Sequence, residues 1–139
     1  MARSLRESVE RGARWPAVDW ANALGQRTTV YRRTQALFQR LDVLVSPTLS
    51  RPALAVDHDA FEPITVGGEI AGSIRGAWYP YDWPFNLSGH PAVSLPCGWS
   101  SDGLPIGLQI VGPWYADRRV LALAAHLERE RPCARPMPL

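Results

Sequence analysis

Apolar residues recur at helical spacing along the N-terminal part of the chain. Residues 4–10 are amphipathic and are followed by Gly12, which predicts a short helix. From about Val18 to Leu41, mostly apolar positions three, four or seven residues apart alternate with Arg side chains, which predicts a longer helix. This stripe consists of Trp20, Leu24, Thr28, Tyr31, Phe38 and Leu41. Such a stripe needs cover, and we expect a sheet to pack against it.

Three segments have the pattern of β-strands. Residues 43–45 form a continuous apolar run that is bounded by Pro47, as in a strand buried on both faces of an α/β fold. Residues 92–95 and 106–111 are two further strands, joined by the turn at residues 100–103. The Asp-Gly pair of this turn supplies the positive φ angles of a tight hairpin. The long helix followed by strand 43–45 predicts half of a crossover unit and therefore an α/β fold.

The middle of the chain predicts a long loop. Residues 47–84 have no clear hydrophobic period and contain many Gly and Pro residues. Aromatic side chains concentrate near the end of this segment, at Trp78, Tyr79, Tyr81 and Trp83. Loops of this length in a compact domain are usually functional or covered by a partner. The glycines neither follow a predicted strand nor open a predicted helix, so no phosphate-binding loop is expected.

The C-terminal region predicts one further helix and a tail. Asp117 is expected to cap this helix. Its expected apolar face consists of Val120, Leu121, Ala124 and Leu127. Residues 131–139 are rich in Pro and are expected to fray. Because 139 residues suit a single domain, we expect residues 1–139 to belong to one domain.

Composition narrows the class of protein. Hydrophobic residues make up 46% and charged residues 20%, as in a globular protein rather than a disordered one. The net charge of +2 is too small to indicate a nucleic-acid or membrane partner. No apolar run approaches the roughly twenty residues needed to cross a bilayer. The two cysteines do not make a disulfide framework and no secretory signal follows Met1, so we expect a cytoplasmic protein.

The densest sequence pattern lies between residues 84 and 112. It reads Pro-Phe-Asn-Leu-Ser-Gly-His-Pro-Ala-Val-Ser-Leu-Pro-Cys-Gly over residues 84–98, and Gly-Leu-Pro-Ile-Gly-Leu-Gln-Ile-Val-Gly over residues 103–112. Together with Asp-Val-Leu-Val-Ser-Pro-Thr at residues 42–48, it resembles the C-terminal segment of the amidase-signature hydrolases. The resemblance covers nearly the whole chain but only the last part of a family member. It implies the C-terminal part of an α/β/α sandwich with a mixed sheet.

The resemblance also implies which chemistry the chain lacks. The family hydrolyses carboxamides without a cofactor, through a Ser, a second Ser in a cis peptide and a Lys, all upstream of this segment. The 15 basic residues of this chain are all Arg, whose pKa stays above about 12 and which cannot exchange a proton near neutrality. We therefore expect no catalytic residue here and no activity of the chain alone.

Other candidate reactive residues have simpler interpretations. Ser73, in Ala-Gly-Ser-Ile-Arg, resembles the surroundings of the family nucleophile, but no base adjoins it and we expect a loop serine. Cys97 with His90 suggests a thiol nucleophile, yet a buried small residue at a strand end is the favoured interpretation. The histidines at 58, 90 and 126 lack the spacing of metal ligands, so no metal is expected.

The aromatic end of the long loop is the candidate for one wall of the substrate pocket. The resemblance places it beside the acyl pocket, which makes Trp78, Tyr79, Tyr81 and Asn86 candidate binding residues for a small-molecule amide with an apolar or aromatic acyl group. Packing in the core is the alternative for the aromatic residues, and Asn86 is expected to bridge backbone groups of its turn. Nucleic-acid stacking is not expected, because acidic residues offset the charge of the nearby arginine.

Two kinds of partner follow from these expectations. A C-terminal segment needs the missing N-terminal amidase segment or self-association to cover its apolar surfaces. The alternative is a non-catalytic binding or assembly module that uses an exposed sheet edge.

Overall fold

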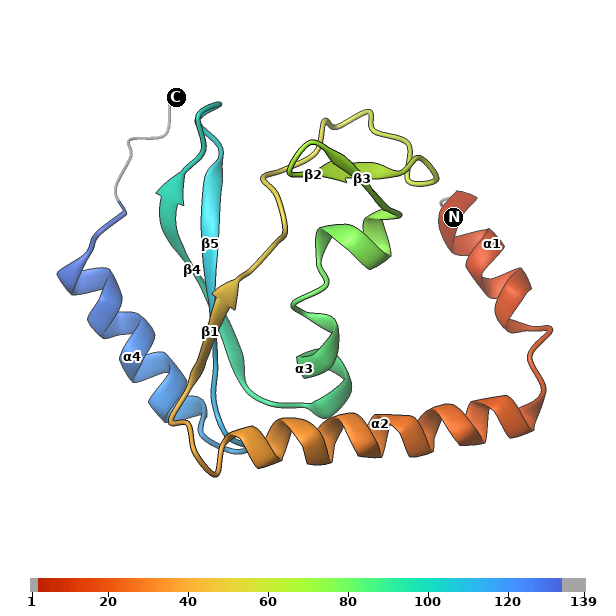
Figure 1. The fold of residues 1–139 in the computed structure, drawn as a ribbon, viewed down its shortest axis with the longest axis horizontal. Helices are drawn as coiled ribbons and strands as arrows, with labels where there is room; N and C mark the ends of the chain where they lie inside the picture. Colours follow the sequence, from red (N-terminus) through yellow and green to blue (C-terminus); the bar gives the residue numbers. More distant parts are fainter. Residues whose placement is uncertain (1–2, 134–139) are drawn as a thin grey trace.

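The computed structural model describes residues 3–133. Figure 1 shows the sheet and α4 near the C-terminal end of α2 and α1 at its other end, with the β2–β3 hairpin between the sheet and α1. The elements are α1 (Arg3–Gly12), α2 (Ala17–Leu37), β1 (Leu44–Pro47), β2 (Ile64–Val66), β3 (Glu69–Gly72), the π-helix η1 (Ile74–Trp78), α3 (Trp83–Ser88), β4 (Ala92–Trp99), β5 (Pro105–Val111) and α4 (Asp117–Glu130). Most of the tail expected to fray, residues 134–139, lies outside the described residues.

The three-stranded sheet has the order β1-β5-β4, with β5 in the middle. Both pairings are antiparallel, and Val111 of β5 lies opposite Leu44 of β1 and Ala92 of β4. The central position of β5 explains why Ile110 and Val111 are fully buried. The α/β fold class is confirmed, and the strand pairings within residues 3–133 are antiparallel.

Helix α4 covers one face of this sheet. Leu95 of β4 and Ile110 of β5 form a buried cluster with Val120 and Ala124 of α4. The helix approaches the end of β5 so closely that a Cβ atom at Gly112 would lie 2.5 Å from Cγ2 of Val120. Glycine therefore permits the contact between the strand end and the helix.

The strand at residues 43–45 differs from its prediction. β1 pairs with β5 in the antiparallel direction, so the expected crossover unit is not formed by these elements. Val45 is 50% exposed, and the expected burial of the strand on both faces is wrong for this residue. Ile106 at the start of β5 is likewise 39% exposed. The physical reason is that α4 packs mainly on β4 and β5, so Val45, which lies opposite Ile110 on the outer strand β1, is left partly uncovered.

The long helix also packs differently from its prediction. α2 contacts α3 rather than the three-stranded sheet. Of the expected stripe, Tyr31 and Phe38 pack against the His90 ring, at centroid distances of 5.7 and 5.3 Å. Trp20, nearer the N-terminus of α2, is 64% exposed. Within the stripe, Tyr31 and Phe38 are therefore partly covered by described residues, whereas Leu41 at its C-terminal end is 43% exposed.

The expectation of one long loop at residues 47–84 is wrong. This segment contains the β2–β3 hairpin, η1 and the start of α3. Gly67 and Gly68, at φ angles of 62° and 89°, form the turn of the hairpin. The strands are too short for a periodic pattern, since β2 has three residues and β3 has four.

The β4–β5 hairpin confirms the predicted pair of strands. In its turn Gly103 has a positive φ angle of 77°, whereas the φ angle of Asp102 is not positive. A single residue therefore supplies the left-handed conformation of the turn.

At α4 the cap is Ala116, and Asp117 is the first helical residue instead of the cap. Leu121, expected on the apolar face, is 60% exposed, because the buried side of α4 is centred on Val120 and Ala124.

Candidate functional site

The aromatic segment predicted to bind substrate connects η1 to α3. Trp78 ends η1, and its Nε1 donates a hydrogen bond of 3.2 Å to the backbone oxygen of Arg51. The Tyr79 ring lies between Trp78 and Trp83, with centroid distances of 6.2 and 5.8 Å. Trp83 Nε1 donates a 2.7 Å hydrogen bond to the backbone oxygen of Arg75. These contacts hold the side chains in fixed relative positions.

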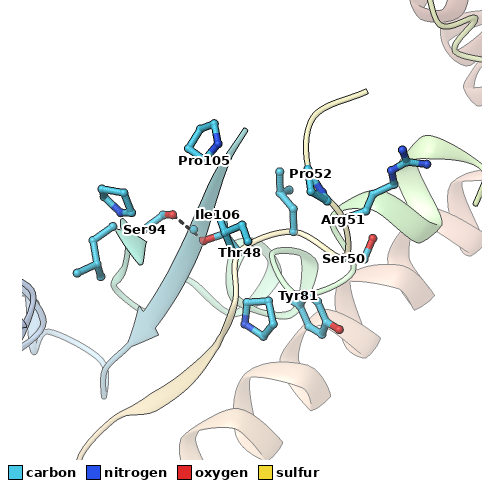
Figure 2. Close-up of a pocket in the computed structure, with 13 residues that line it drawn as sticks. Thr48, Ser50, Arg51, Pro52, Tyr81, Ser94, Pro105 and Ile106 are labelled. Atoms are coloured by element: carbon cyan, nitrogen blue, oxygen red, sulfur yellow. Dashed lines mark hydrogen bonds between the residues drawn. The ribbon is translucent and has the colours of Figure 1, made fainter. Parts of the chain in front are cut away.

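Tyr81 lines a cavity of about 530 Å³, which we call the Thr48 cleft. Its other lining residues belong to the segment after β1 and to strands β4 and β5; they include Leu49, Ser50, Leu95, Pro96, Pro105 and Ile106. Figure 2 shows Thr48 and Ser94 pointing toward one another at one side of the cleft, with Tyr81 at another. The two hydroxyl oxygens of Thr48 and Ser94 are 2.6 Å apart. Most of the lining is apolar, so the cleft suits a ligand with an apolar body.

Gly107 explains how the two hydroxyls come together. Its backbone oxygen accepts a 2.9 Å hydrogen bond from the Thr48 backbone N–H. A Cβ atom at position 107 would lie 2.6 Å from Thr48 Oγ1 and 2.8 Å from Ser94 Oγ. A side chain of any size would therefore displace the pair.

Buried hydrogen bonds position the rim of the Thr48 cleft. Gln109 is 6% exposed, and its Nε2 donates to the Tyr81 backbone oxygen and to Ser46 Oγ, at 3.2 Å each. Ser50 Oγ donates to the backbone oxygen of Ala77, which ties the cleft to η1. Burial raises the pKa of the Asp82 carboxyl, beside Tyr81, above its usual range.

Tyr79 lines a second cavity of about 360 Å³, which we call the Arg75 hollow. It lies between α1 and residues 60–79, and Arg11, Arg75 and Ser73 contribute polar side chains to it. Ser73 Oγ accepts a 3.3 Å hydrogen bond from the Gly76 backbone N–H. This contact caps η1, as short hydroxyl side chains commonly do.

Asn86 is separated from these aromatic residues. It lies on α3, is exposed, and lines neither the Thr48 cleft nor the Arg75 hollow. Within residues 3–133 its side chain forms no backbone bridge of the predicted kind. The structure thus places Tyr81 and Tyr79 at two different cavities, and Trp78 directly precedes Tyr79 along the chain.

A buried polar cluster that the sequence did not predict surrounds His90. His90 is 5% exposed; its Nδ1 lies 2.8 Å from Ser88 Oγ, and its Nε2 lies 2.9 Å from Gln35 Oε1. Because an amide oxygen can only accept, Nε2 carries the proton and Nδ1 accepts from Ser88. Burial lowers the pKa of His90. The Ser-x-His spacing was the available signal, but its partner Gln35 lies 55 residues away.

This cluster has a structural role. Ser88 and His90 show the atoms of a nucleophile and a base in contact, but both are about 95% buried and the third member is an uncharged amide. The expectation that Cys97 is a buried residue at a strand end is wrong, since Cys97 is exposed. Among residues 3–133, no group of three His, Cys, Asp or Glu side chains is placed to hold a metal, and no helix is long and apolar enough to span a membrane.

Comparisons with known proteins show one consistent relationship. The family model described as Amidase matches residues 2–121. AmiA2 of Mycobacterium tuberculosis is 37% identical over 97 residues, covering 70% of this chain and 19% of that protein. A fatty acid amide hydrolase of Medicago truncatula is 32% identical over 129 residues, covering 93% and 21% of the two chains. The crystal structure of a bacterial aryl acylamidase of the amidase signature family matches with a TM-score of 0.77 and 30% identity, covering 99% of this chain and 29% of that one.

Proposed function

Because the chain belongs to the Amidase family, we propose that it forms the C-terminal part of an amidase domain that hydrolyses a carboxamide C–N bond. In this proposal, residues 1–139 supply sheet core and one wall of the substrate pocket. The observation that carries the proposal is the coverage: 99% of this chain matches only 29% of an aryl acylamidase. The chain is thus similar to one continuous share of a larger catalytic fold.

The catalytic residues of the complete enzyme are proposed to lie outside these residues. The family reaction uses a Ser, a second Ser and a Lys, and the 15 basic residues of this chain are all Arg. Ser73 cannot replace the nucleophile, since its described hydrogen bond is to a backbone N–H and no base adjoins it. Activity therefore requires the missing segment.

Exposed apolar side chains support a partner surface for that segment. Along α1, α2 and the link between them these side chains are between 43% and 64% exposed; they are Leu5, Val9, Trp15, Val18, Trp20 and Leu24. Exposed apolar surface, where it is extensive, normally marks an interface. We infer that the missing amidase segment covers it in the complete enzyme, and that copies of this chain associate when the segment is absent.

The proposed substrate is a small-molecule amide with an apolar or aromatic acyl group. Tyr81 would shape its pocket from the Thr48 cleft and Tyr79 from the Arg75 hollow. Trp78 would hold them in place, and Asn86 would contribute from α3, outside both cavities. The apolar lining of the Thr48 cleft supports this choice. Related proteins are named for fatty acid amides and aryl acylamides, which are substrates of the same chemical class. The two free cysteines support a cytoplasmic location.

A second candidate is a non-catalytic assembly module. The outer strands β1 and β4 each have one edge without a partner strand among residues 3–133. Such an edge can pair with another chain. This candidate predicts binding to another protein without any amidase segment.

Sedimentation velocity at micromolar concentration separates the two candidates. The chain is mixed with the part of the aryl acylamidase that it does not match. The amidase proposal predicts self-association of the chain alone and a defined complex with the added part. A compact monomer that binds neither the added part nor a hydrophobic dye contradicts it.

A further inference from the structure

The Arg75 hollow combines positive charge with an apolar surface. Arg11 and Arg75 reach it from α1 and η1, and none of the described residues that line it carries a carboxylate. The charge of an arginine persists at any physiological pH, so the two guanidinium groups favour an anion between them. Figure 1 shows α1 near the β2–β3 hairpin, and the Arg3 guanidinium lies 4.7 Å from the centroid of the Phe61 ring.

Arg75 is available for such an anion. Its guanidinium forms no ion pair or hydrogen bond with any of residues 3–133, although its backbone oxygen accepts from Trp83. Arg11 contacts Ser8 Oγ at 3.4 Å, which is a long and weak hydrogen bond. By contrast, Arg3 pairs with Glu7 and Arg119 with Asp42. The two arginines of the hollow therefore retain free donors for a carboxylate.

The rest of the hollow suits a ring. Phe61, Ile74 and Tyr79 line it together with the arginines, and Phe61 is 45% exposed. The volume of about 360 Å³ lies in the range of small-molecule sites. Arg75 lies within a π-helical turn, a geometry that is frequent at functional sites.

We propose that the Arg75 hollow binds a small aromatic carboxylate, with the ring against Phe61 and Tyr79 and the carboxylate between Arg11 and Arg75. The consequence of this binding for substrate selection rests on the proposed amidase function. In the complete amidase, the hollow would select amides that carry a carboxylate away from the scissile bond. The binding itself concerns only residues of this chain.

Calorimetric titration of the chain with benzoate and with benzamide tests the binding. The two probes share the ring and differ in charge. Benzoate is expected to bind at least about tenfold more tightly than benzamide, as for one charge-assisted hydrogen bond. Arg75→Gln and Arg11→Gln should each weaken benzoate binding about tenfold and leave benzamide binding unchanged. Both arginines are exposed, so these changes do not remove core contacts.

Arg118→Gln is the matched control, because Arg118 is an exposed arginine of α4 that does not line the hollow. It should change benzoate binding less than twofold. Equal affinity for the two probes, or equal losses in the Arg75 and Arg118 variants, overturns the proposal. Because no catalysis is measured, failure here leaves the amidase proposal standing, and absence of amidase activity leaves this binding result standing.

Discussion

Gln35 Oε1 accepts a hydrogen bond from His90 Nε2 at 2.9 Å, which joins α2 to the residues between α3 and β4. The ring also stacks on Phe38 and accepts from Ser88. The described groups in contact with His90 are uncharged, so no neighbouring carboxylate compensates a proton on the ring. The contact has consequences for how stability depends on pH.

Stability should fall as the solution is acidified below pH 6.5. Burial lowers the pKa of His90 from its usual 6.5, so the unfolded chain binds more protons than the folded chain between the two pKa values. The contribution of His90 is complete above 6.5 and is lost as the pH falls toward the lowered pKa. Urea unfolding at a series of pH values measures this slope. The His90→Leu variant should lose it, and an unchanged slope in that variant contradicts the assignment.

Replacement of Gln35 by Leu should lower the free energy of unfolding by about 1–3 kcal/mol, because His90 Nε2 is left as a buried donor without its acceptor. Denaturant unfolding at neutral pH checks the value. Gln39→Leu, at an exposed position just after the end of α2, is the control and should cost less than about 0.5 kcal/mol. Similar losses of unfolding free energy in both variants would show that the hydrogen bond does not contribute to stability.

Gly107→Ala should destabilise the chain by about 1–3 kcal/mol and distort the Thr48 cleft. The added Cβ atom would lie 2.6 Å from Thr48 Oγ1 and cannot be accommodated without movement. Gly98→Ala, also in the β4–β5 hairpin, meets no atom within 4 Å and should be nearly neutral. Thermal unfolding of the two variants makes the comparison, and equal stability would be evidence against the close packing.

Truncation of the sheet core should separate buried positions from exposed ones. Ile110→Ala should cost about 2–5 kcal/mol, since Ile110 is fully buried against α4. Ile106→Ala, at a 39% exposed position, should cost clearly less in the isolated chain, and Arg32→Ala should cost under about 0.5 kcal/mol. Chemical denaturation of all three variants gives the ranking. A loss at Arg32 comparable to that at Ile110 would contradict the strand assignment.

The sequence predicted the elements with long periodic patterns. The two N-terminal helices, the β4–β5 hairpin and the last helix all occur where apolar spacing placed them. Burial was harder to predict, because a pattern identifies an apolar face without identifying what covers it. Val45 has the sequence of a buried strand and is half exposed.

The candidate site was predicted only in part. The aromatic cluster was visible as a local concentration of rings, and Tyr79 and Tyr81 do line cavities. Their assignment to two different cavities depends on β2, β3 and η1, which are too short to leave a period in the sequence. Arg11 and Arg75 line the same hollow although they lie far apart in the sequence. Only the folded chain brings them together.

The most direct test of the amidase proposal is a chimera. This chain replaces the matching segment of the bacterial aryl acylamidase, and hydrolysis of an aryl acylamide is measured. We expect turnover by the chimera, loss of that turnover when its nucleophilic serine is changed to alanine, and none by this chain alone. A folded chimera without activity, or turnover by this chain that vanishes in Ser73→Ala, would contradict it.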